Sequence, residues 1–130
     1  MGLLTLIVYH KQATSARLRF VRFPQSVVAA SLEVEGDPAI VSPHPGPLVT
    51  QAASRLGLPV GELRVDPEFR SRMLVPDGSA TVWLGELTAT DPPFEAVDKA
   101  GGRFALLTEL AGIPDTERDV MRDVYEHILG

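Results

Sequence analysis

The 130-residue sequence contains no cysteine. This excludes a disulfide framework, a thiolate nucleophile and any zinc or iron–sulfur site with cysteine ligands. Acidic residues are missing from the first 32 positions, although Lys11, Arg17, Arg19 and Arg22 lie there. All seventeen acids occur in the rest of the chain, together with only eight bases. We therefore expect one fold with two differently charged faces.

The sequence also has no hydrophobic run long enough to span a membrane. Leu3–Val8 is too short and no basic region precedes it, so we predict a first strand there and not a signal peptide. A composition of 45% hydrophobic and 22% charged residues predicts one globular domain over residues 1–130, which we expect to be cytoplasmic. The net charge of −5 disfavours nonspecific binding to nucleic acid or to an acidic membrane.

Hydrophobic periodicity predicts an α/β (α+β) fold. Apolar residues at helical spacing predict a short helix over Leu48–Leu56, which ends at Gly57, and a longer one from Asp115 to Leu129. The apolar stripe expected on the longer helix consists of Val120, Met121, Val124, Tyr125, Ile128 and Leu129. Alternating or β-branched runs predict strands at Leu3–Tyr9, Arg17–Phe23, Ser26–Val34, Glu62–Leu74, Ser79–Thr90 and Arg103–Leu107.

The region from Gly36 to Leu58 combines a proline-rich loop with the short helix. Its glycines and small apolar residues have a regular spacing, with Gly36, Ala52, Gly57 and Leu58 at the key positions. This spacing resembles the Nudix hydrolase signature: glycine, five spacers, glutamate, seven spacers, then Arg-Glu-apolar-x-Glu-Glu-x-Gly-apolar. The charged positions of that signature are replaced here by Ser42, Thr50, Gln51, Ser54 and Arg55.

The resemblance implies a mixed β-sheet between helices, in agreement with the predicted order of elements. The segment 101–110 also resembles a Nudix stretch in which a strand runs into a turn. In Nudix enzymes the helix glutamates hold magnesium, which neutralises a nucleoside diphosphate and positions the attacking water. Here Arg55 brings a positive charge to the place of the cation, so we predict no metal ligands and no cofactor at this box. An arginine there could instead contact an anionic ligand.

Several side chains are candidates for a site. Gln51, Ser54 and Arg55 share one side of the short helix, and Arg70 and Arg72 alternate along a predicted strand, so together they could bind an anion. Their other interpretation is solubility and cross-strand pairing. Glu86 and Glu95 are the acids that could serve as displaced catalytic groups, or they could be ordinary surface residues.

Three hypotheses remain open from the sequence. The first is a Nudix-like domain without the standard hydrolase site, which binds a small nucleotide-like or anionic ligand or a protein partner. The second is a magnesium-dependent hydrolase of a nucleoside diphosphate derivative with displaced metal ligands. The third is an unrelated α+β domain in which the box spacing is coincidental. Because many Nudix proteins dimerise, a homodimer is a further possibility.

Overall fold

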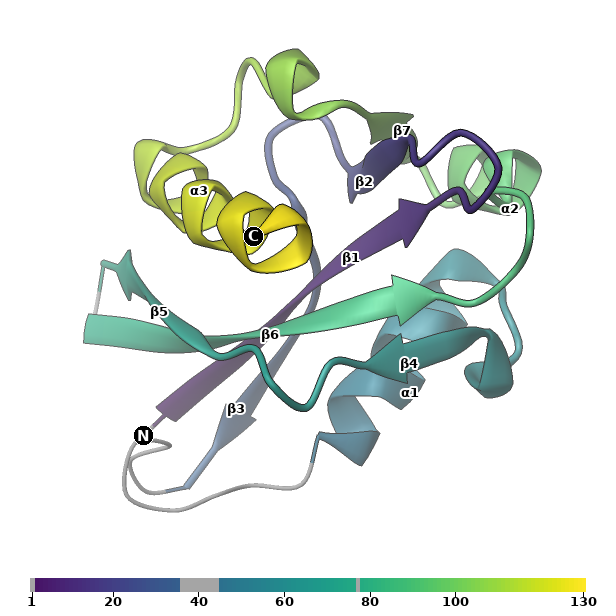
Figure 1. Ribbon diagram of the computed structural model, residues 1–130. Coiled ribbons are helices and arrows are strands. Elements are labelled where there is room, and N and C mark those ends of the chain that lie inside the picture. Colours follow the sequence, from purple (N-terminus) through teal and green to yellow (C-terminus); the bar gives the residue numbers. More distant parts are fainter. Residues whose placement is uncertain (1, 36–44, 77) are drawn as a thin grey trace.

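The computed structural model describes residues 2–35, 45–76 and 78–130. Strands of one mixed sheet form the centre of the molecule (Figure 1), and the helices pack against its faces. The strands are β1 (Gly2–Lys11), β2 (Leu18–Arg22), β3 (Val28–Val34), β4 (Leu63–Val65), β5 (Ser71–Val75), β6 (Gly78–Leu87) and β7 (Arg103–Ala105). The helices are α1 (Gly46–Leu56), α2 (Phe94–Lys99) and α3 (Asp115–Leu129), with short 3-10 turns η1 (Val60–Glu62) and η2 (Leu107–Glu109).

β1 and β6 lie side by side and parallel at the centre of the sheet, in register from Leu3 opposite Ala80 to Tyr9 opposite Glu86. Each central strand changes neighbours along its length. β3 and then β2 pair antiparallel with the first and last parts of β1, and β5 and then β4 do the same along β6. At the start of the two central strands, β3 and β5 therefore form opposite edges of the sheet.

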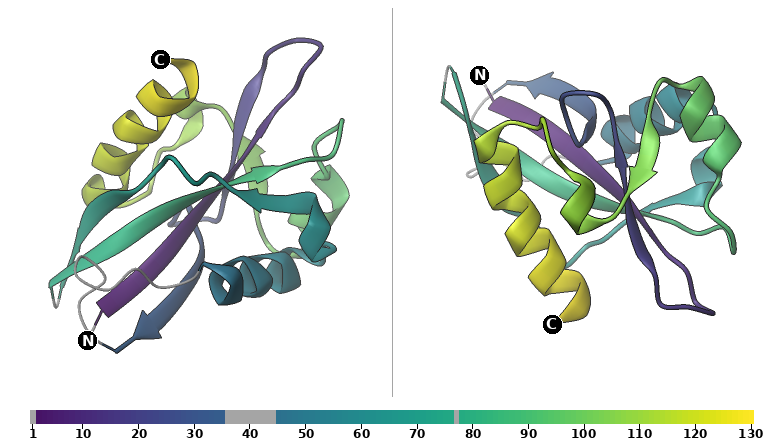
Figure 2. Two further views of the ribbon diagram at one scale, coloured as in Figure 1. Left: turned by 60° about the horizontal axis from the view of Figure 1, so that its bottom comes forward. Right: turned by 90° about the horizontal axis from the view of Figure 1, so that it is seen from above.

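The two faces of the sheet carry separate hydrophobic cores. Because side chains alternate along a strand, Leu4 and Leu6 of β1 pack in the core that contains α1, whereas Ile7 and Tyr9 pack in the core that contains α3. Two further views show α1 and α3 on opposite sides of the sheet (Figure 2). The predicted mixed sheet between helices is confirmed.

Two predicted elements need correction. The expected strand Glu62–Leu74 is interrupted, because the chain turns at Asp66–Arg70 and separates β4 from β5. Pro67 lies in this turn and could not have donated a ladder hydrogen bond. The helix α2 was not predicted, since six residues are too few to show a helical period.

The apolar stripe of α3 is narrower than expected. Val120, Met121 and Val124 are buried, but Tyr125 and Leu129 are 38% and 48% exposed. Glu117 is buried on the same helix, where its carboxylate accepts hydrogen bonds from Ser26 Oγ at 2.9 Å and from the Val27 backbone N–H at 2.7 Å. This contact fixes the beginning of α3 to the chain entering β3.

A buried guanidinium holds the loop before α3 in place. Arg22 is 2% exposed and donates to the backbone carbonyls of Phe23, Pro24 and Glu109 at 3.2, 2.9 and 2.8 Å. The contact with Glu109 joins β2 to η2. Among the described residues, no helix is both long and apolar enough to cross a membrane.

Candidate functional site

The helix predicted over Leu48–Leu56 is present as α1, with Pro47 in its first turn. Gly57 ends it with a φ of 67°, a left-handed conformation that favours glycine. The exposed side of α1 carries Thr50, Gln51, Ser54 and Arg55, as the periodicity predicted. Gly36 and Ser42, which supply the first half of the box spacing, lie outside the described residues.

Gln51 and Arg55 hydrogen-bond to the outer edge of β3. Gln51 Oε1 accepts from the Ser31 backbone N–H at 2.8 Å, and Arg55 Nη1 donates to the carbonyls of Ala29 at 3.0 Å and Val28 at 3.3 Å. Backbone groups two residues apart on a strand point in the same direction, and β1 occupies the other side of β3. The two side chains therefore satisfy groups that an edge strand otherwise offers to water or to another chain.

Arg55 is also held by an aromatic ring. Its guanidinium carbon lies 3.6 Å from the centroid of Phe23, which is buried in the α1 core. Such a cation–π contact contributes on the order of 0.5–1 kcal/mol at an exposed site and more when desolvated. The charge of Arg55 is thus fixed against the fold by a ring and by two carbonyls.

A groove of about 570 Å³ lies beside this contact, and we call it the edge groove. It is bounded by Gln51 and Arg55 from α1, by Glu117 from α3, and by residues of β1, β3, β5 and the chain before β3. These last residues are Leu3, Thr5, Ser26, Val28, Ala29, Ala30, Ser31 and Met73. The groove combines one fixed cation with several hydroxyl and amide groups and an apolar floor.

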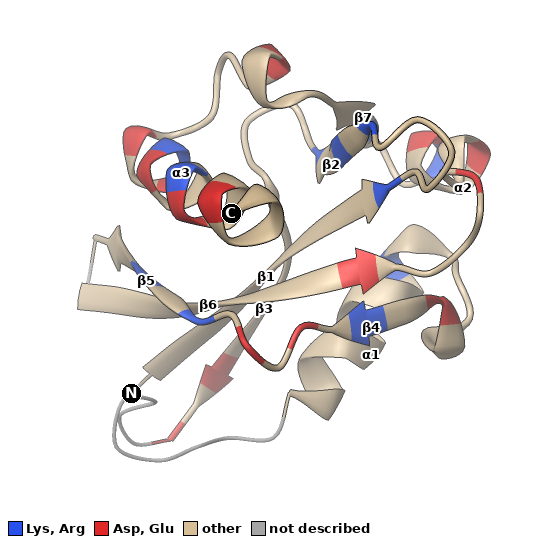
Figure 3. Cartoon of the chain, in the orientation of Figure 1, with Lys and Arg blue, Asp and Glu red and all other residues tan. Residues whose placement is uncertain are grey.

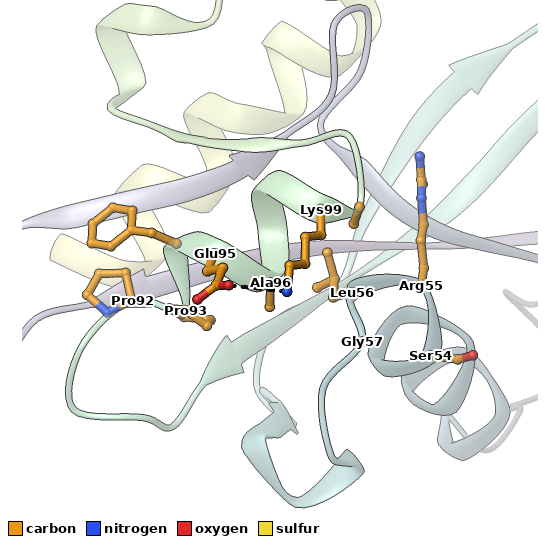
Figure 4. Close-up of a pocket in the computed structure, with 11 residues that line it drawn as sticks. Ser54, Arg55, Leu56, Gly57, Pro92, Pro93, Glu95, Ala96 and Lys99 are labelled. Atoms are coloured by element: carbon orange, nitrogen blue, oxygen red, sulfur yellow. Dashed lines mark ion pairs between the residues drawn. The ribbon is translucent and has the colours of Figure 1, made fainter.

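A second hollow, of about 800 Å³, lies between the end of α1 and α2 (Figure 4), and we call it the helix cleft. Ser54, Arg55 and Glu95 all contribute to its walls. Glu95 is 85% exposed and forms an ion pair with Lys99 at 3.2 Å, drawn as the dashed line in Figure 4. The structure thus brings Glu95, one of the two candidate displaced acids, into the same cleft as two box positions.

Glu86, the other candidate acid, lies elsewhere. It forms an ion pair with Arg64 and accepts a hydrogen bond from Tyr9 Oη at 3.1 Å. Burial, followed by the negative charge of Glu86, raises the pKa of Tyr9. Glu86 is opposite Tyr9, whereas Gln51 binds Ser31, which is opposite Thr5. Four residues of strand separate these two levels by about 13 Å, so Glu86 does not join the box positions.

Comparisons with known proteins now bear on this arrangement. The sequence matches no protein-family model and no curated protein. The structure is similar to a C. elegans Ap4A hydrolase in a binary complex, with a TM-score of 0.66 and 10% identity over 99% of both chains. A second structure of C. elegans Ap4A hydrolase gives a TM-score of 0.63 and 10% identity over 99% of this chain and 98% of that one.

A Nudix hydrolase from M. smegmatis, RenU, is similar with a TM-score of 0.56 and 16% identity, over 98% of this chain and 87% of that one. The chain has the Nudix hydrolase fold. The predicted resemblance is confirmed at the level of the fold, which makes a coincidental box spacing in an unrelated fold untenable. At such low identities the likeness extends to the fold alone.

The residues at the Nudix-box positions do not fit a magnesium ion. Magnesium prefers anionic oxygen ligands in octahedral geometry. Gln51 offers a neutral oxygen that already accepts from Ser31, Ser54 offers a neutral hydroxyl, and Arg55 is a cation fixed on β3. Within residues 2–35, 45–76 and 78–130, no three histidine, aspartate or glutamate side chains gather as a metal site.

The two other arginines of the predicted anion-binding set lie on the opposite edge of the Nudix sheet. Arg72 is on β5, opposite Thr81 of β6, and Arg70 precedes β5 with its guanidinium 4.1 Å from the Trp83 ring centroid. Arg55 binds β3 at the other edge, and β1 and β6 lie between. Three strand spacings amount to about 14 Å, so the structure does not bring the three arginines together.

One pair of polar side chains was not recognised in the sequence. His127 of α3 is half-buried and lies 2.7 Å from Asp66, with its ring 5.2 Å from that of Phe69. The signal was weak because Asp66 precedes Pro67 in a region predicted to be a continuous strand. The one available signal was helical spacing: His127 follows the buried Val120 and Val124 by seven and three residues, which places it beside the buried stripe.

Proposed function

We propose that this chain is a non-hydrolytic Nudix-fold domain that binds a small nucleotide-like or anionic ligand in the edge groove. The observation that carries the proposal is the use of Gln51 and Arg55, at two of the glutamate positions of the box, to complete the edge of β3. Side chains committed in this way hold the sheet together where a Nudix enzyme would hold its metal.

The composition of the edge groove supports an anionic ligand. Arg55 places a permanent positive charge on its wall, and Ser26, Ser31 and Thr5 add hydroxyl groups. Among the described residues of the wall, the one acid, Glu117, already accepts hydrogen bonds from Ser26 and from the Val27 N–H. A volume of about 570 Å³ lies in the usual range for small-molecule sites.

The proposal is tested by measuring binding and turnover separately. Ap4A is the first probe because two of the similar structures are named Ap4A hydrolases; nucleoside diphosphates and their derivatives complete the panel. We expect amide NMR shifts at residues 28–31 and 51–55 without added metal, and no hydrolysis with Mg²⁺ or Mn²⁺. Ser31→Tyr should block the groove and abolish binding, because Ser31 is exposed on its wall.

The matched control is Ser54→Tyr, at an exposed position of α1 that lines the helix cleft and not the edge groove. It should leave binding unchanged. Metal-dependent turnover that survives Gln51→Ala but disappears in Glu86→Ala or Glu95→Ala, with all three variants still folded at the assay temperature, would establish the displaced-ligand hydrolase instead. Failure of every probe to bind would also overturn the proposal.

A further inference from the structure

A third hollow, on the side of α3, shares no residue with the edge groove. It has a volume of about 410 Å³ and lies between α3 and the chain that passes through η2 (Figure 1). We call it the arginine pit. Its walls are Leu107, Thr108, Leu110, Ala111, Arg118, Met121 and Arg122. Leu110 and Met121 are buried and make its floor apolar.

Arg118 and Arg122 lie one helical turn apart at the rim of this pit. Both are exposed, and neither guanidinium group makes a hydrogen bond or an ion pair with another described residue. Acidic and basic positions both occur along α3 (Figure 3), but Asp115 and Asp119 form no ion pair with these arginines. The two charges therefore face the pit without a partner within the described part of the fold.

This placement is unfavourable for the helix itself. Like charges at i and i+4 destabilise a helix. Arg118 is also in the first turns of α3, where the helix dipole disfavours a cation. Asp115 and Asp119, three residues before Arg118 and Arg122 on the same helix, offset part of these costs without forming ion pairs with the arginines. An anion bound between the two guanidinium groups would reverse both effects.

The position of the pit is fixed by groups outside it. Arg22 donates to the Glu109 carbonyl at the end of η2, and Leu106 N–H donates to Glu109 Oε1 at 2.8 Å. Glu117, adjacent to Arg118, fixes the other wall through Ser26 and the Val27 N–H. The hydrogen bonds of Arg22 and Glu117 are buried or partly buried and hold the two walls, so the pit is preformed and little ordering is needed on binding.

We infer that the arginine pit binds a small amphipathic anion, with a carboxylate or phosphate head group between Arg118 and Arg122 and a hydrocarbon body on Leu110 and Met121. Arginine presents a planar fork of donors that matches carboxylate and phosphate oxygens. The apolar floor gains from covering hydrocarbon. A volume of about 410 Å³ suits a ligand of this size.

The test titrates the full chain with octanoate, octyl phosphate, octanol and octylamine, followed by amide NMR. Octanoate, octyl phosphate or both should shift residues 107–111 and 118–122, and the stronger of the two identifies the head group. Octanol should bind at least tenfold more weakly, because it lacks the charge. Octylamine should not bind, because its ammonium group would face two arginines.

The variant Arg118→Gln/Arg122→Gln should weaken binding of the anion at least tenfold with an unchanged or higher melting temperature. The matched control Arg17→Gln/Arg103→Gln removes the same net charge from exposed positions outside the pit and should bind like the wild type. Equal binding of octanol and octanoate, equal loss in both double variants, or no binding by any probe would overturn the inference. None of these outcomes bears on Ap4A binding in the edge groove.

Discussion

His127 and Asp66 join the last turns of α3 to the turn between β4 and β5. Their side chains are 2.7 Å apart and both are largely buried. Burial acts to raise the pKa of Asp66, but hydrogen bonds from the Glu68 N–H and from His127 outweigh it and hold the pKa below its ordinary value. A carboxyl with a depressed pKa stabilises the folded state above the pKa it has in the unfolded chain.

The stabilisation from Asp66 should therefore be present at neutral pH and disappear below about pH 4, as the carboxyl becomes protonated. Urea unfolding of the wild type and of Asp66→Asn should differ at pH 7, and the difference should be smaller at pH 3. Asp119→Asn, at an exposed position of α3, provides the control and should follow the wild type at both values. A constant difference between wild type and Asp66→Asn across this range would contradict the prediction.

At this scale the sequence could place side chains on a face but could not give their partners. Helical spacing correctly put Gln51 and Arg55 on the exposed side of α1. Nothing in that spacing indicates that both reach β3, because the contacts join residues 20 and 26 positions apart. Arg22 shows the same limit, since strand alternation set its face but not the three carbonyls that bury it.

Side chains of Gln51 and Arg55 join α1 to the edge of β3. Gln51→Ala and Arg55→Ala should each lower the free energy of unfolding by about 1–3 kcal/mol, because each removes hydrogen bonds to the strand edge. Arg55→Ala should cost more, since its contact with Phe23 is also lost.

Ser54→Ala is the control for these variants, as Ser54 is exposed on the same helix and is one residue from Arg55. It should change the unfolding free energy by less than about 0.5 kcal/mol. Urea denaturation of the three variants provides the measurement. If Ser54→Ala were as damaging as Gln51→Ala, a general sensitivity of the exposed side of α1 to substitution, and not the strand edge, would explain the result, since alanine itself favours the helix.

An element was predictable where its hydrophobic pattern is long or where a residue such as glycine marks its end. α1 has five buried residues at helical spacing and a glycine end, and β1 has an uninterrupted apolar run. The missed elements are short or locally ambiguous. α2 has one fully buried residue, Val97, and so has no stripe to detect. The break between β4 and β5 depends on packing around Phe69, which is buried beneath α3.

At the scale of the whole molecule, β1 and β6 connect the two cores. Each is flanked by strands on both sides along most of its length and contributes side chains to both faces. Amide hydrogen exchange should therefore be slowest in the middle of these strands, because their hydrogen bonds open only on global unfolding. Faster exchange at Leu6 and Trp83 than in α2 would contradict this order.

The overall arrangement was predictable because the order of elements and the box spacing agreed. The order of hairpin, strand, helix, strands and final helix limits how a mixed sheet can be covered on both faces. The candidate site was less predictable, because the sequence shows which residues stand at the box positions but not what they contact. The contacts of Gln51 with Ser31 and of Arg55 with Ala29 depend on how α1 lies beside β3.

Gln51 and Arg55 both bind the edge of β3, but a glutamate would be tolerated differently at the two positions. A glutamate at position 51 would keep an oxygen able to accept from the Ser31 N–H. A glutamate at position 55 would set a negative charge against the Ala29 carbonyl and leave the Phe23 ring without its cation. A carboxylate could therefore be introduced into this helix at position 51 first, and at position 55 only after another donor had taken over the strand.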